Sequence, residues 1–461
     1  MKNIFIIASF FLCYIANAQF IDDGLRLTQS ENGISPRSNA LGISYYGIND
    51  DGAALYYNPA GMQLVPTTEI QAGLAVKYLN SDINYLSKNF TNDRSDQYLS
   101  NFTFVAPFES EGKKYVIGFG YFNDKSFYDY NNFSTFNGKN SFIAANSKQQ
   151  FMQDLALSNK DGITPLQDSL QQNYSLLQDG SNSRFTGGFS FSLNKTFSLG
   201  FSISGFSTDY SYTKKLDELD AINKYQINDA TSWTDVDFKS LYYTEKLSQD
   251  ISGFTGTIGI MATPTESSRV FLSVDLPNIY TIKEKWNLNA TSDFDNQDYV
   301  DVKSNGESKY TVITPTKFNL GVSYNFVGLT LSGAMSYMDM SNLKFTSSDN
   351  FTDDLNEIVP ERLASAKIDW GVGAEYQLPF YPVFLRASYS SHNTPYRQGF
   401  IDLGTMITKA VGAGVMIGKN IMVDVSLSNR DYDETTLVYS GQSYKNVRDI
   451  TNVLVGFSYR F

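Results

Sequence analysis

The sequence has almost none of the residues that build metal sites and redox centres. Its 461 residues include one cysteine and one histidine. One residue of each kind is too few for a zinc site, a disulfide framework or a Cys-His dyad, so we expect no metal and no cofactor. Lys and Arg number 36 against 48 Asp and Glu, and they form no cluster. Because phosphate contacts need clustered basic residues, nucleic acid is excluded as a partner.

The N-terminus has the pattern of an export signal. Lys2 precedes an apolar stretch, residues 4–16, that ends at the small-x-small sequence Ala16-Asn17-Ala18. This pattern predicts a signal peptide over residues 1–18, because the stretch is too short to cross a bilayer as a helix. The single cysteine lies within the predicted signal peptide, so the predicted mature chain has none.

Long apolar runs are missing from the rest of the chain, which excludes transmembrane helices there. Apolar residues recur instead at every second position. In the last such segment, one face carries Thr451, Val453, Val455, Phe457, Tyr459 and Phe461. Successive side chains of a strand point to opposite faces, so the pattern predicts strands with one apolar face. Fourteen such segments begin near residues 67, 97, 113, 185, 196, 249, 268, 309, 328, 366, 382, 408, 420 and 450.

The spacing of these segments favours a membrane barrel over a soluble sandwich. Short turns alternate with long polar stretches, which lie at 80–96, 124–184, 213–248, 285–307, 344–365, 393–407 and 431–448. Short periplasmic turns and long outer loops are typical of outer-membrane barrels. The sequence therefore predicts an all-β fold, a 14-stranded antiparallel transmembrane β-barrel over residues 66–461 with long extracellular loops, notably 124–184 and 213–248.

This prediction implies a location and partners. We expect a multi-pass protein of the bacterial outer membrane, in contact with outer-membrane lipid and lipopolysaccharide. The terminal Phe461, with Tyr459 two residues before it, is similar to the end signal of barrels that barrel-assembly machinery inserts. That machinery is the expected partner during biogenesis.

Residues 19–65 precede the first strand and do not alternate. They contain the stretch DDGAALYYNPAGM at residues 50–62. Its Ala and Gly residues favour close packing inside a lumen, as an N-terminal hatch. We expect Asp50 and Asp51 to cap a short helix and Asn58-Pro59 to end it, since the residue before proline avoids the α region.

The stretch at 50–62 resembles the hatch motif of the FadL/TodX family of outer-membrane transporters for hydrophobic compounds. The similarity continues through residues 314–324, 369–376, 385–389 and 458–461. The resemblance covers the hatch and the C-terminal third closely, and the middle of the chain only by strand rhythm. It implies fourteen strands, an N-terminal hatch, and passive transport of long-chain fatty acids or aromatic hydrocarbons.

The resemblance also implies roles for particular residues. The hatch motif would comprise Asn58, Pro59, Ala60 and Gly61, and the first mature residues, Gln19 and Phe20, would form an N-terminal gate at an internal ligand pocket. Ligand captured at the outer loops would reach this pocket, hatch movement would open a path, and exit would be sideways beside a kinked third strand. Gly118 and Gly120 lie on that strand and would permit the kink, or they would only make room in a crowded lumen.

Charged residues on the predicted inner face have two interpretations. Arg386, Glu375 and Asp424, with Asp369 and Arg460, would form a salt-bridge network between hatch and wall. Alternatively, Arg386 would hold the carboxylate of a fatty acid, because a guanidinium binds carboxylate in a bidentate manner.

The helix-like apolar positions of the stretch 124–184 also have two interpretations. They would pack this loop against the barrel rim, or they would form a capture groove for hydrophobic ligand.

Three other functions are weighed against transport. An enzyme needs a nucleophile and a base, and His392 with Ser390 and Ser391 is the one candidate set; a solvated loop position for His392 is the alternative, and we expect no enzyme. A general porin conflicts with a hatch in the lumen. A barrel of this shape acting as a structural partner of a protein secretion system is the third possibility, because fold does not determine function.

Overall fold

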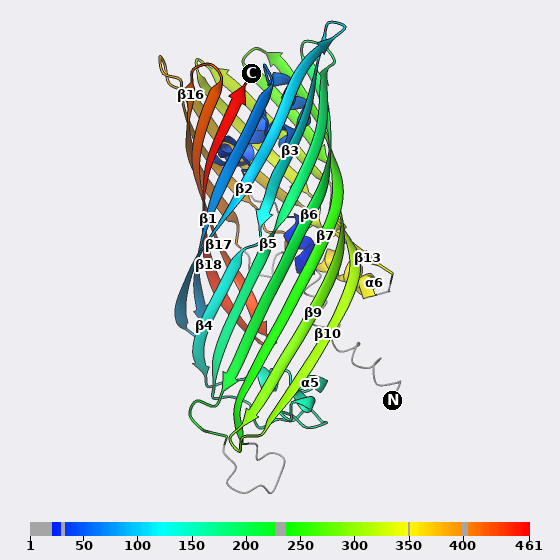
Figure 1. Cartoon of the computed structure of the whole chain (residues 1–461), viewed down its shortest axis with the longest axis vertical. Coiled ribbons are helices and arrows are strands. Elements are labelled where there is room, and N and C mark those ends of the chain that lie inside the picture. The colour runs from blue at the N-terminus through cyan, green and yellow to red at the C-terminus, as the bar shows by residue number, and fades with distance from the viewer. Residues whose placement is uncertain (1–20, 29–32, 226–236, 349–350, 398–403) are drawn as a thin grey trace.

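The computed structural model describes residues 21–28, 33–225, 237–348, 351–397 and 404–461. The predicted signal peptide and the predicted gate residues Gln19 and Phe20 lie outside the described residues. Figure 1 shows a tall barrel that holds the first helices of the chain inside it.

Eighteen antiparallel strand segments form one closed sheet. They are β1 (Glu69–Tyr85), β2 (Lys88–Ser110), β3 (Lys113–Ser126), β4 (Asp129–Asn137), β5 (Leu170–Ser192), β6 (Phe197–Leu219), β7 (Phe238–Thr265), β8 (Ser268–Asp275), β9 (Ile279–Phe294), β10 (Tyr299–Ile313), β11 (Lys317–Phe326), β12 (Leu329–Met338), β13 (Lys344–Ser347), β14 (Lys367–Gln377), β15 (Val383–His392), β16 (Met406–Ile417), β17 (Ile421–Tyr439) and β18 (Gln442–Arg460). The short helices are α2 (Pro36–Leu41), η1 (Gly42–Gly47), α3 (Ala54–Tyr57), η2 (Pro59–Leu64), α4 (Phe142–Ala145), α5 (Gln150–Asp154), η3 (Met340–Asn342) and α6 (Phe351–Arg362).

The eighteen segments occupy fourteen positions around the barrel. Four positions hold two consecutive segments, namely β3 with β4, β8 with β9, β10 with β11, and β12 with β13. β1 pairs with β18 along its length, which closes the barrel. The predicted 14-stranded antiparallel barrel is therefore confirmed.

An apolar band on the outer face marks the membrane-facing part of the barrel. The exposed face of β1 is apolar at one end of the strand, where it carries Leu74 and Tyr78. It is polar at the other end, where it carries Asn80 and Asp82. Leu74 is 64% exposed. A strand tilted across a bilayer needs about 9–11 residues, so only the end nearest the short turns, at the top of Figure 1, is membrane-facing.

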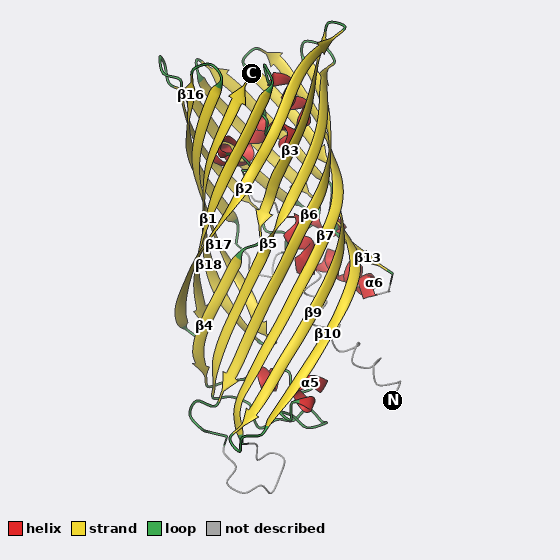
Figure 2. Ribbon diagram, in the orientation of Figure 1, coloured by secondary structure: helices red, strands yellow, loops and turns green. Residues whose placement is uncertain are grey.

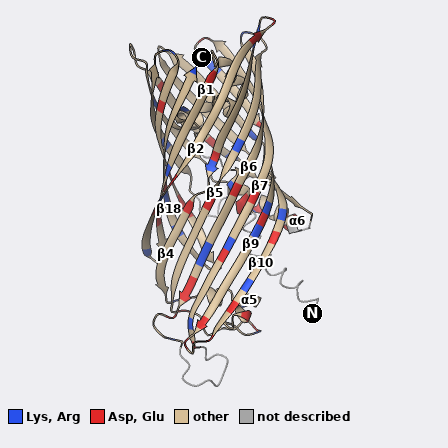
Figure 3. Ribbon diagram, viewed as in Figure 1, with Lys and Arg blue, Asp and Glu red and all other residues tan. Residues whose placement is uncertain are grey.

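Charged side chains distinguish the remaining part of the wall. In Figure 3, Lys, Arg, Asp and Glu gather on the lower half of the near wall. β7 has 28 residues, which at about 3.3 Å per residue is far more than a bilayer needs. The barrel wall therefore continues well beyond the apolar band.

This extension corrects the prediction that the polar stretches are loops. Residues 80–96, 285–307 and 431–448 lie mostly in paired strands, as the yellow hairpins of Figure 2 show. The stretch 124–184 holds β4, α4, α5 and the first half of β5, and 213–248 holds the ends of β6 and β7. Outside a membrane both faces of a hairpin are solvated or polar, so its strands lose the apolar alternation that identifies them in a sequence.

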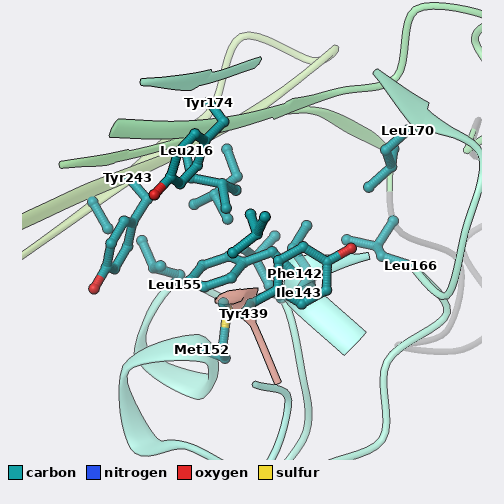
Figure 4. Close-up of a cluster of buried hydrophobic side chains, with 14 of the residues drawn as sticks. Phe142, Ile143, Met152, Leu155, Leu166, Leu170, Tyr174, Leu216, Tyr243 and Tyr439 are labelled. Atoms are coloured by element: carbon teal, nitrogen blue, oxygen red, sulfur yellow. The ribbon is translucent and has the colours of Figure 1, made fainter. Parts of the chain in front are cut away.

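Residues 138–169, here called the outer lid, pack across the outer end of the lumen. Phe142, Ile143, Leu155 and Leu166 of the lid are fully or almost fully buried. Their apolar cluster includes strand residues from β1, β5, β6, β7, β9, β17 and β18. Figure 4 shows lid side chains against Tyr174, Leu216 and Tyr243 of the wall. The packing interpretation of these apolar positions is the one that the structure supports.

Within the described ranges, no helix is long and apolar enough to cross a bilayer.

Candidate functional site

The N-terminal segment, residues 33–65, fills the membrane-facing part of the lumen. Its first half, α2 and η1, contacts β11, β12 and β14–β18. Its second half, α3 and η2, contacts β3 and β5–β7. Almost every residue of the segment is buried. The segment therefore closes the lumen at the end with the short turns, and the outer lid closes the other end.

Local sequence explains the turns of this segment. The Ser35 hydroxyl accepts from the Ser38 amide and so caps α2, and Pro36 occupies its first turn. The Asp51 carboxylate accepts from the Ala53 amide at the start of α3, at 2.9 Å. α3 ends at Tyr57, and Asn58 has an extended backbone before Pro59. The extended Asn58 before Pro59 agrees with the sequence prediction for this helix. The prediction of capping by Asp50 and Asp51 is wrong: the N-cap is Ala53, which makes no side-chain capping bond, and Asp50 pairs with Arg37 instead.

The predicted hatch motif fits niches in the wall. The Asn58 side chain accepts from the Ala60 amide at 3.0 Å and donates to the carbonyls of Ile260 and Leu272. The wall is shaped for this contact, because a Cβ at Gly259 would lie 2.0 Å from Asn58 Oδ1. A Cβ at Gly200 would lie 2.2 Å from the Ala60 amide nitrogen.

Two further contacts fix the end of the motif. A Cβ at Gly61 would lie 2.2 Å from the Asn49 carbonyl oxygen within the segment itself. Lys114 of β3 donates to the carbonyls of Gln63 and Val65, at 2.8 and 2.7 Å. The motif is therefore a set of backbone approaches to the wall and contains no reactive group.

Gly118 and Gly120 face the N-terminal segment. A Cβ at Gly118 would lie 2.8 Å from Met62 Sδ, and one at Gly120 would lie 3.2 Å from Leu55. The register of β3 is regular past both glycines against β2 and against β5. The pairing of the described strand is therefore uninterrupted at both glycines, and they make room for the segment, while the kink stays a prediction.

The interruption of this strand lies farther along. β3 pairs with β2 only up to Phe122, which lies opposite Asn101. Its register against β5 shifts between Asn123 and Lys125, and β4 begins at Asp129. β2 has a matching irregularity against β1 at Ser100. Residues 88–100 of β2 and 123–137 of β3 and β4 form no ladder with each other, and we call this the unpaired stretch.

The unpaired stretch begins inside the apolar band, because Asn101 lies opposite Gly73 of β1. Side chains bridge it in place of backbone bonds. Ser126 donates from its hydroxyl to the Asp96 carboxylate, and Lys77 donates to the Ser126 carbonyl at 3.0 Å. A few side-chain bonds are easier to break than a strand ladder, so the wall is weaker here than where its strands pair.

A buried ion network joins the N-terminal segment to the opposite wall. The Arg37 guanidinium donates to both oxygens of Glu375, at 2.8 and 2.7 Å, and to Asp51 at 3.1 Å. Arg386 donates to the same Glu375 and to Asp424, both at 2.5 Å. The Arg386 side chain is 2% exposed. Its guanidinium is held by two carboxylates, so the salt-bridge interpretation of Arg386, Glu375 and Asp424 is the one that the structure supports.

Two more arginines extend the network. Asp50 of the N-terminal segment binds Arg37 at 2.5 Å and Arg269 of β8 at 2.6 Å. Burial alone raises the pKa of Asp50, but the two guanidinium groups outweigh it and lower this pKa to about 2. Arg460 binds Glu69 at 2.6 Å, and Glu69 accepts from the Gly52 amide at 2.8 Å.

A cavity lies on the outer side of the N-terminal segment. Its lining comes from the segment and from the outer ends of β11, β12 and β14–β17, and comprises Thr28, Gly42, Ile43, Tyr46, Tyr56, Tyr57, Lys317, Ser336, Tyr337, Met338, Met340, Lys367, Asp369, His392, Met406 and Arg430. Aromatic and Met side chains supply an adaptable apolar surface. Lys317 donates to the Tyr46 hydroxyl at 3.3 Å, and Arg430 donates to Thr408 at 3.2 Å. Both of these partners are neutral.

His392 lines this cavity and is only 8% exposed, at the end of β15. The expectation of a solvated loop position is therefore wrong. Its Nδ1 lies 3.6 Å from Asp369, while the neighbouring Ser390 hydroxyl accepts from the Ile43 amide at 3.1 Å. The Ser390 hydroxyl is thus engaged by the N-terminal segment.

Sequence reasoning missed Arg37, Arg269, Lys317 and Arg430. Arg37 lies in the non-alternating segment, so no periodicity showed which way it points. The wall cations are on polar faces, where a luminal charge and an extracellular charge look alike in sequence. A useful signal was available for Arg37, because an arginine in an Ala- and Gly-rich plug needs carboxylate partners on the wall.

The described structure is thus a 14-stranded barrel with a membrane-facing band and a lumen closed by its own N-terminal segment. Among solved structures, it is similar to a FadL homologue of Pseudomonas aeruginosa, with 13% identity, a TM-score of 0.59, and coverage of 89% of this chain and 94% of that chain. The toluene transporter TodX of P. putida matches with 15% identity, a TM-score of 0.55, and coverage of 89% and 94%. The toluene transporter TbuX of Ralstonia pickettii matches with 16% identity, a TM-score of 0.52, and coverage of 93% and 99%.

At these identities the likeness is one of fold, and the chain has a FadL/TodX-like fold. No family model matches the sequence, and no curated protein matches it.

Proposed function

We propose that the protein is a passive outer-membrane transporter for hydrophobic compounds, such as long-chain fatty acids or aromatic hydrocarbons. The cargo reaches the cavity beside Tyr46 and Tyr57, and it leaves sideways into the bilayer through the unpaired stretch. The fold of hydrocarbon transporters supports this proposal. Outer-membrane lipid surrounds the apolar band, and lipopolysaccharide surrounds the adjacent wall.

The observation that carries the proposal is the position of the unpaired stretch. It begins within the apolar band, between β2 and β3, and continues beside the polar end of β1. A polar solute gains nothing from an opening that faces lipid, whereas an apolar one is stabilised by entering it. The closed lumen argues in the same direction, because a general porin needs a continuous aqueous path.

The N-terminal segment acts as the hatch in this mechanism. The motif Asn58, Pro59, Ala60 and Gly61 is held by backbone approaches and side-chain amides, whereas the half around Arg37 is held by ion pairs. Moving the half of the segment that contains the motif breaks fewer ion pairs than moving the half around Arg37, so the motif half is the part that moves. It is also the half that contacts β3 and β5.

The charge of the cavity bears on the cargo. Lys317 and Arg430 line it, and their partners there are the neutral Tyr46 and Thr408. A carboxylate head group binds such cations favourably, and the Met and Tyr surface receives an apolar body. We assign the head-group role to these two cations in place of Arg386, whose guanidinium is already paired.

An engineered disulfide across the unpaired stretch tests the lateral exit. The predicted mature chain has no cysteine, so Asp96→Cys with Ser126→Cys forms a defined pair where the side chains already meet. The control pair is Ser211→Cys with Ser248→Cys, on two strands that are already paired. Transfer of a fluorescent fatty acid into liposome lipid should stop when the first pair is oxidised and recover on reduction. Transfer that continues through the oxidised first pair would exclude this exit.

A further inference from the structure

One aromatic side chain, Tyr56, joins the cavity lining to the last residue of β3 that pairs with β2. Tyr56 lines the cavity, and its ring centroid lies 5.2 Å from that of Phe122 at an interplanar angle of 68°. Phe122 is the last residue of β3 that pairs with β2. Tyr56 therefore lies between the ligand space and the point where the wall loses its backbone pairing.

The surroundings of Tyr56 contain two buried charges. Arg184 of β5 lies opposite Phe122 in the strand register, and its guanidinium carbon is 4.5 Å from the centre of the Tyr56 ring. Asp124 lies two residues beyond Phe122, and its buried carboxylate interacts electrostatically with the Tyr56 side chain. The ring thus contacts the cation on one side, and the anion lies close to the same side chain.

Each of these charges has an unused polar atom. Arg184 Nη2 and Asp124 Oδ1 are buried, and neither has a hydrogen-bond partner among the described residues. Buried polar atoms are normally paired, because leaving one unpaired costs free energy. Diagonal neighbours on adjacent strands are about 7–8 Å apart between Cα atoms, which long side chains can span.

We infer that Tyr56 is the gate between the cavity and the lateral exit, and that Arg184 and Asp124 form an ion pair when the ring moves aside. In the closed state, the Tyr56 ring stacks on Arg184, and Arg184 and Asp124 each keep one unpaired polar atom. In the open state, Arg184 loses the ring and pairs directly with Asp124. Each state has its own favourable contacts, so the element has two alternative arrangements. This inference rests on the proposed function for its cargo, but the gate itself is a property of the wall.

The first experiment follows release of cis-parinaric acid, a fluorescent fatty acid, from the purified full-length protein into liposome lipid. Tyr56→Ala removes the ring and should raise the release rate at least tenfold, with the bound stoichiometry unchanged. Tyr56→Phe keeps the ring and should stay within about threefold of the wild type. Tyr46→Ala is the matched control, since it also lines the cavity but packs against Tyr57 and Lys317; it should alter binding and leave the rate constant for release unchanged.

The second variant tests the open state. Asp124→Asn leaves the ring stack in place and removes the anion that Arg184 would join. Release should slow at least threefold, whereas loss of a purely structural contact would loosen the wall and speed release. Release at the wild-type rate in both Tyr56→Ala and Asp124→Asn would overturn the inference.

A labelling experiment without any fatty acid tests the gate separately from the proposed transport function. Ser126→Cys places the only cysteine of the mature chain at the unpaired stretch, where Ser126 is 2% exposed. Its labelling by an apolar maleimide should rise at least tenfold when Tyr56→Ala is added and should not change with Tyr46→Ala. Faster labelling without any binding of cis-parinaric acid would support the gate and contradict the proposed cargo. Unchanged labelling alongside normal fatty-acid transfer would overturn the gate and leave transport standing.

Discussion

Replacing Arg37 by Met should loosen the N-terminal segment without unfolding the barrel. The Arg37 guanidinium makes two bonds to Glu375, one to Asp51 and one to Asp50, and its side chain is 14% exposed. After the change, Glu375 keeps Arg386 and Asp50 keeps Arg269. Among the described residues, Asp51 loses the one cation that forms an ion pair with it. Removing one member of a buried ion pair costs about 3–5 kcal/mol, and we take about 3 because two of the three carboxylates keep a cation.

Hydrogen exchange measures this loss locally. A free energy of opening lowered by about 3 kcal/mol speeds exchange by about a hundredfold, since each 1.4 kcal/mol is a factor of ten. Amides of residues 36–62 should show this change, and those of β6 and β7 should not. The control is Lys285→Met, which breaks an exposed pair with Glu307 at 3.4 Å, with side chains 71% and 73% exposed. Unchanged exchange at residues 36–62 would refute the view that these ion pairs hold the segment.

Three other outcomes are expected. Asp50 has a folded-state pKa of about 2 against an ordinary 3.8, so its stabilisation of the segment is complete above pH 3.8 and is lost toward pH 2. Hydrogen exchange of the segment should therefore become faster, relative to the unfolded chain, as the pH falls through this range. Asp50→Asn should remove this pH dependence. Gly200→Ala should displace the hatch and raise leak conductance, because its Cβ would lie 2.2 Å from a backbone nitrogen, whereas Gly187→Ala, with its nearest atom at 3.7 Å, should not. Leu155→Ala should cost the outer lid about 2–5 kcal/mol and raise its exchange, because Leu155 is 0% exposed, whereas Ile163→Ala, at 55%, should leave lid exchange unchanged.

The number of strands could be predicted because turns and long polar stretches alternate along the chain. Membrane-facing positions carry the clearest signal, and the face with Val453, Val455 and Phe457 does point outward in β18. The same period-two signal fails beyond the membrane. In β10, Val300 and Val302 alternate with Asp301 and Lys303, but neighbouring positions are Ser, Asn and Gly, so the apolar contrast is too weak to show a strand.

The interruption of the wall could not be predicted from residues alone. Gly118 and Gly120 were reasonable candidates for a kink, because glycine weakens strands. In the structure these glycines accommodate Leu55 and Met62, while pairing ends at Phe122, a residue with good strand propensity. The end of pairing coincides with the irregularity of β2 against β1 at Ser100 and with the register shift of β3 against β5, and both are properties of strand pairing that the local sequence does not show.

The charged residues of the lumen could be located from the family resemblance and the alternation pattern, but their role could not. The inner-face pattern correctly placed Arg386 among Glu375 and Asp424, but it did not decide between binding cargo and binding the wall. That choice depends on charge balance: both carboxylates bind Arg386, and Glu375 also binds Arg37, so an incoming carboxylate would have to displace a buried, hydrogen-bonded partner. Displacing such a partner leaves an unpaired buried anion, which costs more than the new contact returns. Under the proposed function, a charged cargo would therefore bind where the cations have neutral partners, at Lys317, and the arginines of the network would hold the segment that the cargo has to pass.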